Sequence, residues 1–251
     1  MYQRTLVLIP TYNEASNIKD LITTLYQLYP QLNIIIIDDC SPDATAEIVS
    51  TLQKDFPTLH LLKRQGPRGL GNAYKKGFEW GVEQNHFDYF IQMDADFSHD
   101  PSEIRQMLEQ LETNQAYDIV LGSRYSNGFR VENWELWRIC LSYFASIYVR
   151  LITSIPVKDP TSGFKAYRSK VINSLPVANL KSQGYIFQLE LIYQAWSRGF
   201  QIYEHPILFS ERRSGKSKIN LKIILEAIFA VITLRFSKKE NDEKKSLDYK
   251  V

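Results

Sequence analysis

Several protein classes are excluded by what this sequence has little of. Its two cysteines, Cys40 and Cys140, have neither the spacing of a metal site nor the number that a disulfide framework needs, so we expect a reducing compartment. No stretch has the about 18 consecutive uncharged apolar residues that a membrane-spanning helix needs. The first residues lead into a short apolar run, so we expect no secretory signal.

Charge of one sign is not in large excess either. The net charge is +2, which gives no reason to expect nucleic acid as a partner. The positive side chains are unevenly placed, however, and a group of them lies close together: Arg212, Arg213, Lys216, Lys218 and Lys222. Such a group is usually a solvated surface, but the small residues between these cations also suit a mobile loop that grips an anion.

The histidines form no recognisable metal or catalytic pattern. All four are scattered along the chain, and none has metal-ligand spacing. His99 lies near an acidic pair, but we treat it as an ordinary loop residue.

The first half of the chain alternates strand and helix patterns. Apolar runs predict strands at 5–9, 33–37, 59–63, 89–93 and 118–122. Helical spacing predicts helices at 14–29, 43–54 and 69–83, and another that begins at about Pro101. Repeated strand–helix units predict an α/β fold with a mostly parallel sheet and helices on both faces. In such sheets ligands bind at the carboxyl ends of the strands.

The second half is less regular. We expect amphipathic, apolar helices at 134–153 and 219–236, a helix at 184–198, a turn at 159–164 and an extended segment at 201–210. A single domain over 1–236 is the simplest interpretation. Residues 237–251 are highly charged, so we expect a disordered tail there.

Two carboxylates follow the predicted strand at 89–93. Asp94 and Asp96 repel each other unless a cation lies between them, and oxygen ligands suit Mg²⁺ or Mn²⁺, which in turn binds a diphosphate. An Asp-x-Asp sequence alone is more often a polar turn. Here the segments 10–14, 38–39 and 123–124 also follow strands, so all of them should meet at one rim, and this convergence predicts a site.

The other rim residues each have two interpretations. Asp39 is placed to bind a ribose or a base, or else residues after it merely cap the next helix. Tyr12 and Glu14 suit base stacking and base-edge binding, or else this segment only starts a helix. Arg124 suits a phosphate, with a plain salt bridge to Asp94 or Asp96 as the alternative.

The order of these segments resembles that of dolichyl-phosphate mannosyltransferases, which are inverting family 2 glycosyltransferases of the GT-A fold. The resemblance covers about residues 4–236. It is carried by Pro10-Thr11-Tyr12-Asn13-Glu14, Ile37-Asp38-Asp39, Met93-Asp94-Ala95-Asp96, Gly122-Ser123-Arg124-Tyr125, Asp159-Pro160-Thr161-Ser162-Gly163-Phe164, Gly184-Tyr185-Ile186-Phe187-Gln188 and Gly215-Lys216-Ser217-Lys218.

The resemblance implies transfer of mannose from GDP-mannose to a dolichyl or polyprenyl phosphate, with Mg²⁺ or Mn²⁺ as cofactor. The nucleoside would be held by Pro10, Tyr12, Glu14, Ile37 and Asp39. Metal and diphosphate would be held by Asp94, Ala95 and Asp96, and the phosphates would be gripped by Arg124, Arg212 and Lys218. UDP-glucose or another UDP-sugar is the alternative donor. A nucleotide-sugar-binding subunit without turnover is the alternative function.

Two features depart from the family pattern. Some members have Gln as a further metal contact where this chain has Ser98, which leaves the third ligand open. Many members continue into transmembrane helices, whereas this chain has the charged segment 237–251. We therefore expect a cytoplasmic protein that associates peripherally with the cytoplasmic face of a membrane through the apolar helices at 134–153 and 219–236, as a homodimer or with a small membrane-anchor subunit. The alternative is that these helices simply pack on the sheet or form a homodimer.

Overall fold

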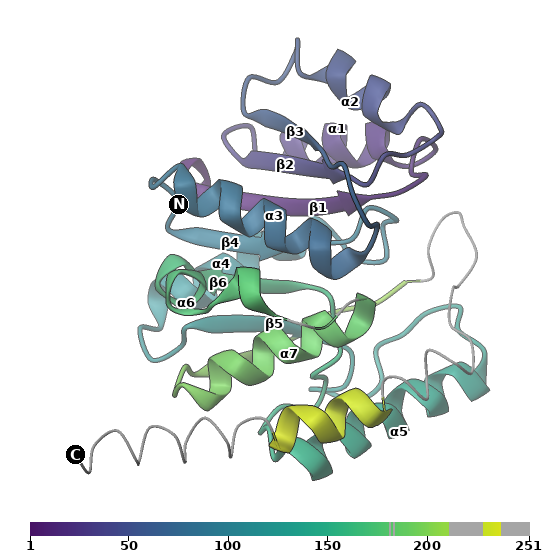
Figure 1. Cartoon of the computed structure of the whole chain (residues 1–251), viewed down its shortest axis with the longest axis vertical. Coiled ribbons are helices and arrows are strands. Elements are labelled where there is room, and N and C mark those ends of the chain that lie inside the picture. The colour runs from purple at the N-terminus through teal and green to yellow at the C-terminus, as the bar shows by residue number, and fades with distance from the viewer. Residues whose placement is uncertain (181, 183, 211–227, 237–251) are drawn as a thin grey trace.

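The computed structural model describes residues 1–180, 182, 184–210 and 228–236, and its centre is a seven-stranded sheet (Figure 1). The order across the sheet is β3-β2-β1-β4-β6-β5-β7. The strands are β1 (Thr5–Thr11), β2 (Asn33–Asp38), β3 (Leu59–Lys63), β4 (Tyr89–Gln92), β5 (Ile119–Ser123), β6 (Lys165–Arg168) and β7 (Ile202–Pro206).

Helices cover both faces of this sheet. They are α1 (Ile18–Leu28), α2 (Thr45–Leu52), α3 (Leu70–Glu83), α4 (Glu103–Thr113), α5 (Leu136–Thr153), α6 (Ser169–Ser174) and α7 (Gly184–Ser197), with short 3₁₀ turns at Tyr2–Arg4 and Val177–Asn179. In Figure 1, α3 and α7 cover the face turned to the viewer. The expected α/β fold is confirmed, with boundaries that differ by a few residues.

One strand was not expected from the sequence. β6 pairs antiparallel with both β4 and β5, whereas the other strand pairs are parallel. Its sequence, Lys-Ala-Tyr-Arg, has no apolar run, which is why no strand was predicted. Because β6 runs the opposite way, the loop that precedes it lies at the same edge as the carboxyl ends of β4 and β5.

The core consists of two layers, one on each side of the sheet. Leu6 and Leu8 of β1 point into the layer formed with α3, α5 and α7. Val7 and Ile9 of the same strand point into the layer formed with α1 and α4. All four side chains are fully buried, as expected for a strand whose apolar run is continuous rather than alternating.

The described C-terminal residues, 228–236, form a helical segment beside α5 (Figure 1). The Tyr148 hydroxyl of α5 donates to the backbone oxygen of Ile228 at 3.0 Å, and Val149 and Val231 join the same buried layer. The remainder of the helix expected at 219–236 and the tail expected at 237–251 lie outside the described residues. Among the described helices, none is long and apolar enough to cross a membrane.

Candidate active site

The site lies at the edge of the sheet where the parallel strands end. Asp94 and Asp96 follow β4, and Arg124 follows β5. The loop 159–164 precedes β6 and reaches the same edge, because Lys165 at the start of β6 pairs with Gln92 at the end of β4. The expected convergence is confirmed for Asp94, Asp96 and Arg124, which line one cavity, whereas the loop 159–164 was not expected at this rim.

The acidic pair is held by its own loop. The Oδ1 atom of Asp96 accepts hydrogen bonds from the Ser98 backbone at 3.1 Å and from its hydroxyl at 2.6 Å. Asp96 is buried, whereas Asp94 is half-buried. Ser98 therefore orients one carboxylate of the pair.

His99 is part of this site, and treating it as an ordinary loop residue was wrong. It is buried, its Nδ1 accepts a hydrogen bond from the Asp94 backbone at 3.1 Å, and its ring stacks on Phe164 with centroids 4.9 Å apart. Burial lowers the pKa of His99 to about 4, against an opposing effect of the Asp96 charge, so the ring is neutral at pH 7. Its position close after Asp96 was the available signal.

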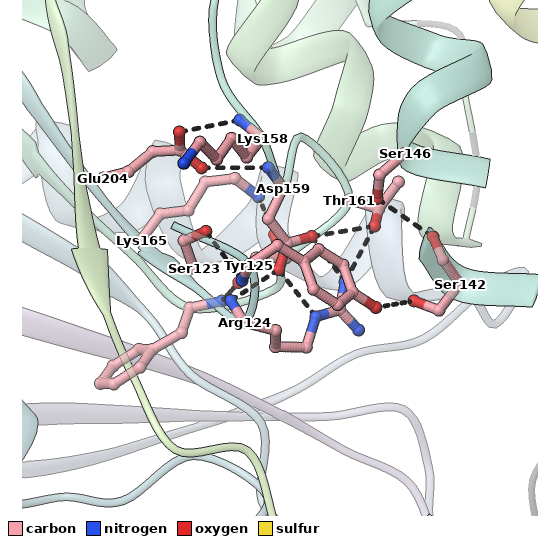
Figure 2. Close-up of polar contacts among 12 residues, drawn as sticks. Ser123, Arg124, Tyr125, Ser142, Ser146, Lys158, Asp159, Thr161, Lys165 and Glu204 are labelled. Carbon is pink, nitrogen blue, oxygen red and sulfur yellow. Dashed lines mark hydrogen bonds and ion pairs between the residues drawn. The ribbon is translucent and has the colours of Figure 1, made fainter. Parts of the chain in front are cut away.

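Arg124 pairs with Asp159, and the alternative of a salt bridge to Asp94 or Asp96 is wrong. Figure 2 shows its guanidinium against this carboxylate: Nε donates to Oδ2 at 2.7 Å and Nη2 to Oδ1 at 2.6 Å. Nη2 also donates to the Thr161 hydroxyl at 2.9 Å. Burial by itself would lower the pKa of Arg124, but the Asp159 carboxylate raises it, so the guanidinium stays charged.

The loop that carries Asp159 is itself anchored. Glu204 of β7 accepts hydrogen bonds from the backbone amides of Lys158 at 2.8 Å and Asp159 at 3.0 Å (Figure 2). A chain of contacts therefore leads from β7 through the loop to Arg124.

Lys165 is a buried cation that the sequence did not single out. Its Nζ donates to the backbone oxygen of Ser162 and, at 3.0 Å, to Oε1 of Gln188 on α7. Burial lowers the pKa of Lys165 to about 7, while the charge of Asp159 opposes this shift. It lies on the strand that was not predicted, so no local pattern pointed to it.

The expected nucleoside-binding residues lie in β1 and β2 or directly after them. The Asp39 carboxylate forms an ion pair with Arg64 and accepts a hydrogen bond from the Gly69 backbone at 2.8 Å. The Tyr12 ring lies under the Arg68 guanidinium, 4.5 Å from its centroid. Glu14 accepts a hydrogen bond from the Asn17 side chain at 2.9 Å.

Hydrogen bonds also join the loops after β1 and β2. The backbone amide of Asn13 donates to the Ser41 hydroxyl at 3.0 Å, and that of Ala15 donates to the Asp43 carboxylate at 3.1 Å. Pro10 is in β1, and the Ile37 side chain is fully buried in the core. Ala95 is buried between the two aspartates. Arg212 and Lys218 lie outside the described residues.

A cavity of about 520 Å³ joins the charged residues to an apolar wall. Asp94, Asp96, His99 and Arg124 line its polar part. The apolar wall comes from α5, α7 and the segment 228–236: Leu141, Phe144, Ala145, Tyr148, Val149, Leu189, Ile228 and Val231. The site can thus take a ligand that carries both an anionic group and a hydrocarbon chain.

Relatives with named activities match most of the chain. A polyprenol monophosphomannose synthase of Mycolicibacterium smegmatis is 38% identical over 230 residues, which cover 91% of this chain and 86% of the relative. An undecaprenyl-phosphate mannosyltransferase of Micrococcus luteus is 36% identical, with 91% and 92% covered. A dolichol-phosphate mannosyltransferase of Pyrococcus furiosus is 33% identical, with 88% and 60% covered.

Solved structures show the same fold at low identity. Glucosyl-3-phosphoglycerate synthase of Mycobacterium tuberculosis, in a complex with Mn²⁺, UDP and glucosyl-3-phosphoglycerate, has a TM-score of 0.67 and 17% identity, with 93% of this chain and 78% of that chain covered. The sequence profile described as glycosyl transferase family 2 matches residues 6–175. With this match and relatives of up to 38% identity along nearly its whole length, the chain belongs to glycosyl transferase family 2.

Proposed function

We propose that this protein transfers mannose from a nucleotide sugar, GDP-mannose, to a polyprenyl or dolichyl phosphate with inversion at the anomeric carbon. The observation that carries the proposal is the cavity, whose lining combines Asp94, Asp96 and Arg124 with the apolar residues of α5. A phosphate on a long hydrocarbon chain matches both parts of this lining. The named relatives support the same acceptor class and the same sugar.

The acidic pair suits a divalent cation that also binds a diphosphate. Both carboxylates line the cavity, and no group of three or more acidic, histidine or cysteine side chains surrounds them among the described residues. An ion held by two carboxylates has further coordination positions for other ligands. This fits Mg²⁺ or Mn²⁺, which keep water and phosphate ligands. Held by Asp94 and Asp96, such an ion would neutralise charge on the leaving diphosphate.

The chemistry needs no general base from the protein. A phosphate monoester has a second pKa of about 6, so the acceptor oxygen is largely ionised at neutral pH. This oxygen forms the new bond to the anomeric carbon as the bond from that carbon to the diphosphate breaks. The protein would contribute alignment and fixed positive charge, which agrees with a His99 that is neutral and accepts a hydrogen bond from the Asp94 backbone.

We further propose that the protein works at a membrane surface through α5 and the segment 228–236. Large apolar side chains are exposed on both, Leu136 at 80% and Phe229 at 68%, together with Trp137, Phe144, Leu151 and Phe236. The cavity lies against these elements, since the exposed side chains of Phe144 and Ile228 line it. A lipid phosphate could therefore enter the cavity while its chain stays near the membrane.

A panel of radiolabelled nucleotide sugars, each with a short polyprenyl phosphate and with or without Mn²⁺, tests the function. We expect metal-dependent label transfer from GDP-mannose into the lipid. Transfer from a UDP-sugar instead would change the donor and keep the reaction class. No transfer from any donor, with the nucleotides still bound, would support a binding subunit and overturn the proposed reaction.

A further inference from the structure

His99 carries one hydrogen-bond donor whose position in the ring is fixed. The Asp94 backbone N–H donates to Nδ1 at 3.1 Å, so Nδ1 carries no proton and the neutral ring carries it on Nε2. His99 lines the cavity, and within the described ranges Nε2 makes no hydrogen bond. A donor that faces a cavity and has no partner among the described residues is available to a ligand.

The ring is also held in one orientation. It stacks on Phe164 at an interplanar angle of 14° and meets Phe209 edge-on at 74°. On its Cε1 side the neighbour is Gly163, where even a Cβ atom would come within 3.3 Å of the ring. Rotation of the ring would break the bond to Asp94 and these contacts, so the Nε2–H donor is already placed before a ligand arrives.

The surroundings favour an anionic oxygen as the ligand. Arg124 lines the same cavity, and its Cζ lies 5.5 Å from the Phe209 ring that His99 also contacts. A protonated Nε2 cannot ligate a metal, whereas an N–H donor in a cavity that a guanidinium also lines suits phosphate. Both substrates of the proposed reaction carry phosphate.

We propose that His99 is a substrate-binding residue whose Nε2–H donates a hydrogen bond to a phosphate oxygen of the donor diphosphate or of the acceptor monoester. The inference rests on the proposed function, because that function brings these two phosphates to the cavity. It assigns His99 two roles at once: Nδ1 supports the acidic pair, and Nε2 binds substrate.

Two amide substitutions separate these roles. In His99→Asn the side-chain oxygen can take the place of Nδ1 and accept from Asp94, but the distal donor is lost. In His99→Gln the amide nitrogen can take the place of Nε2, but the acceptor for Asp94 is lost. His86→Asn is the matched control, because His86 is exposed and does not line the cavity.

Calorimetric titrations measure each phosphate separately: GDP with Mg²⁺ for the donor, and a short polyprenyl phosphate for the acceptor. His99→Asn should weaken one of them by about 10- to 100-fold, since the lost hydrogen bond is to a charged group, and the affected ligand identifies the source of the phosphate. His99→Gln should retain more of that affinity. Wild-type affinity of His99→Asn for both ligands would overturn the proposal.

A measurement on the unaltered protein covers the case that a variant does not fold. With ¹⁵N-labelled histidine, the Nε2 resonance of His99 should shift on addition of GDP with Mg²⁺ or of the polyprenyl phosphate. A resonance that both ligands leave unchanged would contradict the proposal. If the wild type binds these ligands through His99 but transfers no sugar, the proposed function fails and this inference stands.

Discussion

Arg124 and Asp159 form a buried bidentate ion pair, with side-chain contacts of 2.7 and 2.6 Å and a further bond of 2.9 Å from the Arg124 backbone. The aspartate is fully buried, and the arginine side chain is 10% exposed. The charge of Arg124 is therefore largely compensated before any phosphate arrives. The guanidinium is held in one position by Asp159. The loop before β6, which carries Asp159, therefore determines where this positive charge lies.

Removal of the Asp159 charge should destabilise the protein strongly. Asp159→Asn keeps the shape of the side chain but leaves the Arg124 guanidinium buried without its counter-charge. We expect the free energy of unfolding to fall by about 3–5 kcal/mol, as measured by denaturant titration. Thr161→Val, which removes the hydroxyl contacts to Arg124 Nη2 at 2.9 Å and to Asp159 Oδ1 at 3.3 Å but leaves both charges paired, should cost far less. Equal losses in the two variants would contradict this account.

Loss of either acidic side chain should abolish transfer and leave the fold intact. Asp96→Ala removes one of the two carboxylates that line the cavity, so binding of GDP in the presence of Mn²⁺ should be lost while the melting temperature changes little. Binding and transfer assays with and without a chelator check this. Full activity of Asp96→Ala in the presence of the chelator would refute the metal role.

A side chain at Gly163 should disturb the site rather than the core. A Cβ there would lie 3.3 Å from His99 Cε1 and in ordinary contact, at 3.5 Å, with Asp94 Oδ2, so Gly163→Ala should displace the His99 ring that supports Asp94 and weaken metal-dependent GDP binding. Gly122→Ala is the comparison, because its Cβ would meet two core side chains, Ile207 at 3.1 Å and Phe164 at 3.3 Å. We expect that variant to lose stability more than ligand affinity, the reverse of Gly163→Ala.

Lys165 should make stability depend on pH above neutrality. Its pKa is lowered from 10.5 to about 7, so between these values the unfolded state binds the proton that the folded state has released. The free energy of unfolding should therefore rise with pH in this window, by at most roughly 1.4 kcal/mol per pH unit. In Lys165→Met this rise should be absent. Parallel pH curves for the two proteins between pH 7 and 10 would disprove the shift.

Exposed apolar residues of α5 should control membrane binding. The wild type should sediment with anionic liposomes, more weakly at high salt because screening reduces the contribution of Lys and Arg. Trp137→Asp and Phe144→Asp should reduce sedimentation without lowering the melting temperature, since both side chains are more than 60% exposed. If the wild type does not bind liposomes at low salt and still acts on short water-soluble acceptors, membrane docking is wrong.

Sequence patterns predicted those parts of this protein whose structure follows from residues close together in the chain. Continuous apolar runs such as that of β2 predicted five strands, and carboxylates after β4 predicted the acidic pair. What was missed depends on distant neighbours. The buried Lys165 finds its partners in Ser162 and in Gln188 of a later helix, and a polar four-residue strand has no local pattern.

The position of β6 has a consequence for the order in which the protein can assemble. β4 and β5 are not hydrogen-bonded neighbours, because β6 lies between them although it follows both in the chain. In a nascent chain that ends before Lys165, the strands β3-β2-β1-β4 can pair with one another. The edge of β4 and the edge of β5 that β6 later occupies are then still unpaired. Asp94 and Arg124 are separated by only thirty residues in sequence. We nevertheless expect them to reach their final relative positions only after residue 168 has left the ribosome, when β6 can pair with both β4 and β5.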